Sequence, residues 1–209
     1  MKLIINLVVF TVWGILTVGC ASTGQKNAGE ASGVVSRFLT TPDGSVDGFL
    51  FQDGMQIRFP SHMSTIVTDA VAVGDEVTVK GEESTTNSMW AKHIITSKNA
   101  NEIDVTSEAK GKMLAPKRER LAAIKNVNNI SVRGEIDTLI VEPSGEVSGF
   151  LLTEGSLVRL PTDIRRPTKA YDVGQYVEVT GYGSENKFGK SVEASTVQRQ
   201  SDVYQIDTE

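Results

Sequence analysis

Short apolar runs separated by turn residues extend from residue 33 to residue 198, and this pattern predicts a β-rich protein. Apolar and polar residues alternate with a period of two over 76–81, as expected for a strand with one buried face. Asp53-Gly54 stands between two apolar runs and is a strong hairpin signal. The pattern predicts five strands in the first half of the chain, over 33–40, 46–52, 55–59, 76–81 and 89–96, with an irregular or helical stretch at 61–71.

The same order of elements occurs a second time. Gly-Phe-Leu-Phe at 48–51 and Arg-Phe-Pro at 58–60 return 101 residues later as Gly-Phe-Leu-Leu at 149–152 and Arg-Leu-Pro at 159–161. The second set of strands is expected over 132–141, 146–152, 156–160, 175–181 and 190–198. A duplicated unit marks its own boundaries. The sequence therefore predicts two domains, 33–98 and 132–198, a polar linker at 99–131 in which 116–125 has the pattern of a short helix, and a C-terminal tail at 199–209.

Five strands interrupted between the third and the fourth are the layout of the OB-fold, a small Greek-key barrel. Both units resemble bacterial OB-fold domains, and in the first unit the resemblance rests on 46–48, 53–54, 58–62 and 74–77. The second unit departs from this pattern at Asp163 and Gln175, where the first has His62 and Asp75. The resemblance implies an all-β protein of two tandem five-stranded OB-fold-like barrels. The alternative is a single sandwich of ten strands.

Residues 1–19 have the pattern of an export signal, with Lys2 followed by an almost wholly apolar stretch that is short for a bilayer span. Cys20 is the one cysteine of the chain. The segment 16–21 resembles the lipobox of bacterial lipoproteins, which implies cleavage before Cys20 and lipidation of its thiol. Ala21 at the next position favours the outer membrane if the cell is Gram-negative, and 20–32 is expected to be a flexible tether. The alternative is an uncleaved membrane anchor.

The charge of each unit bears on its partners. Residues 33–98 contain 5 basic and 8 acidic residues, and 132–198 contain 7 and 10, so each unit has a net charge of −3. Phosphate binding normally requires a basic surplus. The sequence therefore argues against nucleic acid as a partner.

Candidate ligand contacts are few. Arg58 and Arg159 are retained in both copies, and either clamp an anion or pair with a neighbouring acid at the barrel rim. The other candidates are His62, Trp90, Arg165, Arg166, Lys187 and Lys190. A metal site needs clustered ligands at defined spacings, so neither a metal nor another cofactor is expected. No nucleophile, base and oxyanion donor form a recognisable set, so no catalytic residue is expected.

These observations predict a non-catalytic envelope lipoprotein that is anchored by lipid, on the periplasmic face of the outer membrane. Its barrels are expected to bind an envelope protein, a glycan or a cationic species. The first alternative is binding of single-stranded nucleic acid or oligosaccharide, because OB barrels often bind such oligomers. The second alternative is an enzyme of unknown type.

Overall fold

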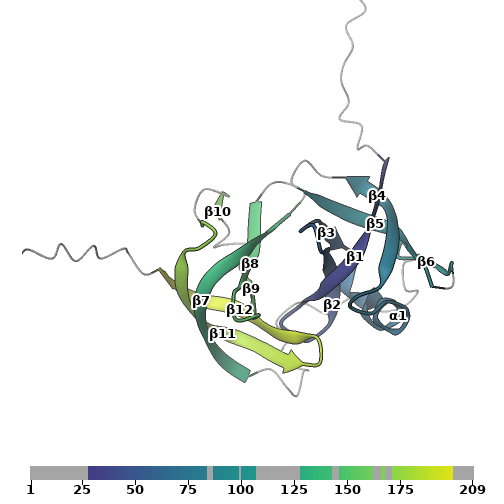
Figure 1. The fold of residues 1–209 in the computed structure, drawn as a ribbon. Coiled ribbons are helices and arrows are strands. Elements are labelled where there is room, and N and C mark those ends of the chain that lie inside the picture. Colours follow the sequence, from purple (N-terminus) through teal and green to yellow (C-terminus); the bar gives the residue numbers. More distant parts are fainter. Residues whose placement is uncertain are drawn as a thin grey trace, which may run out of the picture.

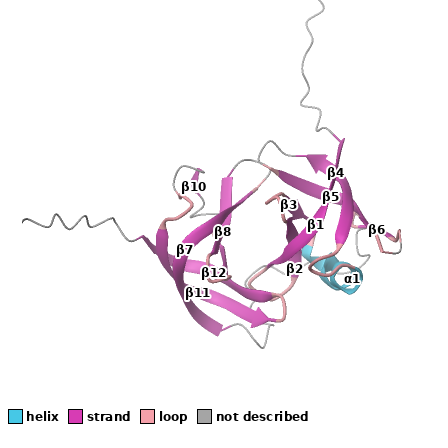
Figure 2. Cartoon of the chain, viewed as in Figure 1, coloured by secondary structure: helices cyan, strands magenta, loops and turns pink. Residues whose placement is uncertain are grey.

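Two β-barrels lie side by side in the computed structural model, which describes residues 28–83, 87–98, 100–106, 128–142, 146–161, 166–167 and 171–199 (Figure 1). Strands dominate these residues, and the short helix α1 (Ser64–Ala70) lies beside the first barrel (Figure 2). Across the described segments, no helix has the length and apolar character needed to cross a bilayer. The expected signal at 1–19, Cys20, the tether up to 27, the helix at 116–125 and the tail from 200 onward lie outside the described residues.

The first barrel has the OB-fold strand order. Its strands are β1 (Ala28–Thr40), β2 (Val46–Phe51), β3 (Gln56–Arg58), β4 (Glu76–Glu83) and β5 (Ser88–Thr96). They pair in the order β3-β2-β1-β4-β5, and a parallel pairing of β3 with β5 closes the barrel. The 3-10 turn η1 (Ser61–Met63) and α1 fill the break between β3 and β4, as the sequence predicts.

The second barrel repeats this plan. Its strands are β7 (Asn128–Val141), β8 (Glu146–Leu152), β9 (Leu157–Arg159), β11 (Tyr176–Asn186) and β12 (Gly189–Arg199). Antiparallel pairing runs β9-β8-β7-β11-β12, and a parallel pairing of β12 with β9 closes it. The strands form two separate sheets, which confirms two barrels and excludes one sandwich of ten strands.

Three segments of strand lie where the sequence pattern predicts tether or linker. β1 begins at Ala28 because its first residues pair with β4, and β7 begins at Asn128 because its first residues pair with β11. The short strand β6 (Glu102–Asp104) lies within the expected linker, pairs with β5 and buries Ile103. These segments are mostly polar, so apolar periodicity does not mark them. A further short strand, β10 (Arg166–Pro167), pairs with the start of β8.

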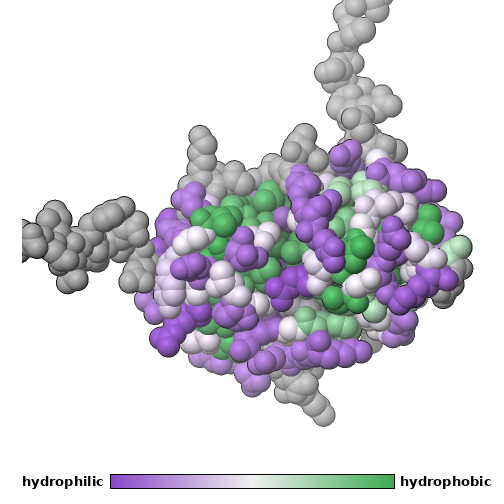
Figure 3. Space-filling model, in the orientation of Figure 1, coloured by the Kyte–Doolittle hydropathy of each residue, from purple (hydrophilic) through white to green (hydrophobic). Residues whose placement is uncertain are grey.

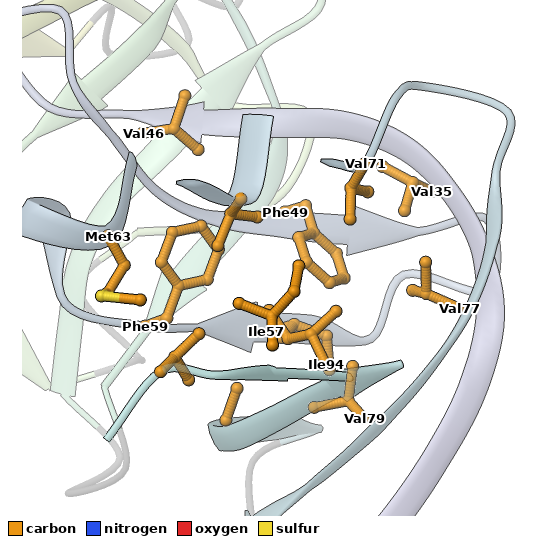
Figure 4. Packing of buried hydrophobic residues seen from close by; sticks show 14 of the residues in the cluster. Val35, Val46, Phe49, Ile57, Phe59, Met63, Val71, Val77, Val79 and Ile94 are labelled. Carbon is orange, nitrogen blue, oxygen red and sulfur yellow. The ribbon is translucent and has the colours of Figure 1, made fainter. Parts of the chain in front are cut away.

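The core of the first barrel follows strand parity. Phe49 and Phe51 are buried in the core of the barrel with ring centroids 5.6 Å apart. Phe59 lies 6.1 Å from Phe49, and Figure 4 shows these two rings among the other core residues. Because neighbouring residues of a strand face opposite sides, Leu50 points outward, away from this core. It is nevertheless buried, which requires a second packing surface outside the barrel.

The glycines repeated in both copies meet two different needs. Gly54 and Gly155 have φ values of +85° and +100° in the turn before the third strand, a conformation that favours glycine. Gly149 has no such angle, but a Cβ there would collide with the carbonyl oxygen of Val158 on the adjacent strand. The second strand therefore lies too close to the third for any side chain at this position.

Candidate functional site at the seam between the barrels

The outer faces of the first three strands of the two barrels pack against each other, and we call this contact surface the seam. Five apolar side chains, each at most 5% exposed, form its centre: Leu39, Leu50, Ile140, Leu151 and Leu157. OB barrels commonly bind oligomers with the face of strands 2 and 3. In this protein each of those faces is covered by the other barrel.

Gln56 of β3 connects the seam to the backbone of the second barrel. Its Nε2 donates a hydrogen bond to the carbonyl oxygen of Leu139 at 2.8 Å, and its Oε1 accepts one from the amide of Val141 at 3.1 Å. Both the donor and the acceptor of the side-chain amide are thus satisfied in a residue that is 5% exposed. Unpaired polar groups at such a position are costly, so this pair of bonds fixes β3 against β7.

A buried charge cluster lies beside the apolar centre. Asp47 accepts a hydrogen bond from Arg58 Nη2 at 2.9 Å and another from Arg159 Nη2 of the second barrel at 2.5 Å. Arg159 Nε also donates to the carbonyl oxygen of Thr40 at 3.1 Å, and Glu142 lies 4.0 Å from Arg58. Two arginines and two acids give the cluster a net charge of zero. Burial of ions is tolerated only with such pairing.

The cluster is not symmetric, although the fold is duplicated. Ser148 stands in the second copy where the first has Asp47, and its hydroxyl donates to the carbonyl of Ile140 at 3.3 Å. Asp47 is therefore shared by both arginines. The Nε and Nη1 atoms of Arg58 are buried and have no hydrogen-bond acceptor among the residues that the structure describes.

Burial lowers the pKa of Arg159 to about 10, which the negative charge of Asp47 opposes and the nearby charge of Arg58 reinforces. Burial also lowers the pKa of Arg37 on β1, against the opposing effect of Asp137 and then Glu154. Arg37 Nη2 donates to the carbonyl oxygen of Gly155 in the second barrel at 3.0 Å. The barrel contact therefore extends from the charge cluster to the β8–β9 turn.

The hairpin between β11 and β12 extends the contact at another edge. Asn186 Nδ2 donates to the carbonyl oxygen of Gly44 at 2.8 Å, and Phe188 packs edge-on against Phe38 with ring centroids 5.3 Å apart. Lys187 Nζ lies 4.8 Å from the centre of the Phe188 ring. This hairpin holds the first turn and first strand of barrel 1 against barrel 2.

Of the ligand contacts predicted from the sequence, the structure brings Arg58 and Arg159 together. They pair with an acid, which is one of the two alternatives that the sequence left open. Trp90 is the cross-strand neighbour of Arg58 and is 37% exposed, so it borders the seam. His62 is exposed on η1, and Lys190 pairs with Glu185 at 3.4 Å. Arg166 belongs to β10, whereas Arg165 lies outside the described residues.

Sequence reasoning missed Asp47, Gln56 and the leucine layer of the seam. A signal for the leucines was present, because consecutive apolar residues such as 48–51 and 149–152 indicate strands that are buried on both faces. Asp47 carried no such signal, since an acid close to a turn usually faces water.

The arrangement is suited to holding two domains together and offers no evident reaction chemistry. Within the described segments, no three His, Cys, Asp or Glu side chains are grouped as metal ligands. The polar groups of Gln56, Asp47 and Arg159 are engaged by partners across the seam.

Comparison with known proteins yields distant structural neighbours only. No protein-family model matches the sequence, and no curated protein does. A deletion mutant of the single-stranded DNA-binding protein from Thermus aquaticus is 14% identical, with 86% of this chain and 96% of that chain covered at a TM-score of 0.26. The wild-type protein from Thermus aquaticus is also 14% identical, with 82% and 91% covered at a TM-score of 0.24.

These neighbours correct one expectation. The charge of the two units argued against nucleic acid as a partner, yet both neighbours are described as single-stranded DNA-binding proteins. We therefore withdraw the exclusion of nucleic acid. The TM-scores are too low for the neighbours' ligand to be assigned to this chain.

Proposed function

We propose that the chain is a non-catalytic binding module of the cell envelope, built from two OB-fold barrels held as one body and tethered through a lipidated Cys20. The observation that carries the proposal is the seam. Its leucine layer, the two bonds of Gln56 and the shared Asp47 join the barrels with strand-2 and strand-3 faces turned inward. A pair built in this way presents its remaining outer faces at a fixed spacing, as an interaction module requires.

The outward surface agrees with this function. Polar residues cover most of the face seen in Figure 3, and apolar residues appear as separate patches on both barrels. The chain has a net charge of −5. An acidic, mixed surface favours an envelope protein, an uncharged glycan or a cationic species as the partner.

The anchor is tested by mass spectrometry of the chain purified from membranes of a Gram-negative host. The expected product lacks residues 1–19 and carries acyl groups on Cys20. Cys20→Ser is the matched control, because it preserves size and polarity and removes the acyl acceptor. A wild-type chain that keeps residues 1–19 would contradict the lipoprotein part of the proposal.

Binding of single-stranded nucleic acid is the second candidate, and the exposed Trp90 favours it. OB barrels stack bases on aromatic rings, and Trp90 is an exposed ring of the first barrel. Its strand neighbour Arg58 is buried and paired with Asp47, so the ring alone supports this candidate. The test is fluorescence anisotropy with a thymidine oligonucleotide of about 20 residues, at about 50 and 200 mM salt. A true binder loses affinity at higher salt and on Trp90→Ala. Binding that is absent at both salt concentrations removes this candidate.

A further inference from the structure

A groove lies on the outer face of the sheet formed by β7, β11 and β12, outside the seam. Its volume is about 410 Å³, within the range of small-ligand sites. Six outward-facing polar side chains line it together with Val132 and Val179: Ser131, Arg133, Glu178, Thr180, Thr196 and Gln198.

Strand register arranges these side chains in two rows across the sheet. Glu178 of β11 lies between Arg133 of β7 and Gln198 of β12. In the next row Thr180 lies between Ser131 and Thr196, and the hydroxyls of Thr180 and Thr196 bond each other at 2.6 Å. Positions two residues apart on a strand are separated by about 7 Å. The rows therefore present guanidinium, carboxylate, amide and hydroxyl groups over a span of one or two sugar rings.

The first row, which we call the charged row, consists of Arg133, Glu178 and Gln198, and its side chains have free donors and acceptors. Arg133 and Glu178 are directly opposite each other, yet they form no ion pair, and neither they nor Gln198 have a side-chain partner in the described part of the chain. All three are exposed. Together they offer several donors and acceptors with a net charge of zero. Such a set suits a ligand with many hydroxyl or amide groups and no net charge.

The outward face of β11 carries an aromatic residue beyond the residues that line the groove. Tyr182 is two residues beyond Thr180 on the same face of β11, and it is 55% exposed. A tyrosine ring has an apolar face and a polar tip. A sugar ring has the matching character, with C–H groups on its faces and hydroxyl groups at its edges.

The first barrel has no equivalent of this free set. By register, Ser32 and Thr78 occupy the places of the arginine and the glutamate, and their hydroxyls bond each other at 2.8 Å. Glu30 and Lys80 occupy the next row and form an ion pair at 3.8 Å. The polar groups of barrel 1 are thus paired among themselves, which makes barrel 1 an internal control.

We propose that the groove of barrel 2 binds an uncharged oligosaccharide, with Tyr182 stacking against a sugar ring while Arg133, Glu178 and Gln198 bond its hydroxyl or amide groups. This inference rests on the proposed binding function and names its ligand class. OB barrels accommodate oligosaccharides. The zero charge of the row favours a neutral chain over an acidic one.

The test is an array of neutral, amino and acidic oligosaccharides probed with the full chain, followed by calorimetric titration of the best neutral sugar. Tyr182→Ala and Glu178→Gln are each expected to weaken binding by about tenfold. Ser32→Ala in barrel 1 is the matched control and is expected to leave the affinity unchanged. Thermal unfolding of each variant shows whether the fold is retained.

Each outcome bears on one claim. Neutral-sugar binding that survives both groove substitutions would overturn the groove as the site, while the proposed binding function stands. An array in which no neutral sugar binds would overturn the ligand class. Mass spectrometry of Cys20 does not depend on either sugar-binding result, so it tests the membrane-anchor part of the proposed function independently.

Discussion

Replacing Asp47 with asparagine tests whether the shared carboxylate holds the barrels together. The substitution preserves the shape of the side chain and removes its charge. Asp47 contacts Arg58 at 2.9 Å and Arg159 at 2.5 Å, and the three side chains are only 13%, 8% and 10% exposed. Asparagine keeps one acceptor oxygen, so one arginine retains a hydrogen bond and the other loses its partner.

The magnitude follows from the burial of the two cations. Removing one partner of a buried ion pair costs about 3–5 kcal/mol. Glu142, at 4.0 Å from Arg58, compensates only in part. For a chain of this size each kcal/mol lowers the melting temperature by about 2–4 °C. Asp47→Asn is therefore expected to lower it by roughly 6–20 °C.

The assay is thermal and urea unfolding of the full chain followed by circular dichroism, with small-angle scattering to detect separation of the barrels. Asp69→Asn is the matched control, because Asp69 is exposed on α1 and is expected to change stability by less than about 0.5 kcal/mol. The double variant Asp47→Asn with Arg159→Met should lose less than the two single variants summed, since it leaves one fewer unpaired cation. An Asp47→Asn variant within about 1 kcal/mol of the Asp69→Asn control would refute the reasoning.

Three further predictions concern single residues. Arg58→Met is expected to destabilise the chain less than Arg159→Met in urea unfolding, because two nitrogen atoms of Arg58 lack acceptors while the Nε of Arg159 bonds across the seam. Gly149→Ala is expected to cost about 1–3 kcal/mol by the same assay, because its Cβ meets a backbone carbonyl of the facing strand. A hydrogen bond from Lys98, and then one from a backbone amide, lowers the pKa of Asp75. A carboxyl group whose pKa is lowered by folding stabilises the fold at a pH above its pKa in the unfolded chain, and this stabilisation is lost as the pH falls through its pKa in the folded chain. Melting temperatures measured from pH 6 to below about pH 4 should therefore fall less for Asp75→Asn than for the wild type.

The barrels were predictable from the sequence because their signals are local. Gly54 is required by the φ angle of a single turn, and Phe49 is placed in the core by the parity of a single strand. Each of these sequence signals occurs in both copies, so each copy supports the interpretation of the other. β6 escaped prediction because a three-residue strand with one buried isoleucine has too few positions to show a period.

The seam was harder to predict from the sequence because its residues make contacts between distant parts of the chain. Gln56 bonds residues more than eighty positions away, and its copy is Leu157, so the repeat itself gives no hint of the bond. The retained Arg58 and Arg159 did mark the place. Arg58 pairs with Asp47 of its own barrel, but the pairing of Arg159 with Asp47 depends on how the two barrels meet, and that information is absent from either copy alone.

The asymmetry of the seam explains why a duplicated domain pairs within one chain. In a pair of second barrels, Arg159 would lose its hydrogen-bonded partner Asp47, because Ser148 stands at that position. Glu142 belongs to the second barrel and lies 4.0 Å from Arg58, so it compensates only in part. The loss of the bonded carboxylate acts against such a pairing. The face of the first barrel supplies what that of the second lacks: Asp47 reaches Arg159, and Gln56 bonds the backbone of β7. Divergence at a few seam positions therefore favours the pairing of unlike barrels over pairing between identical second barrels.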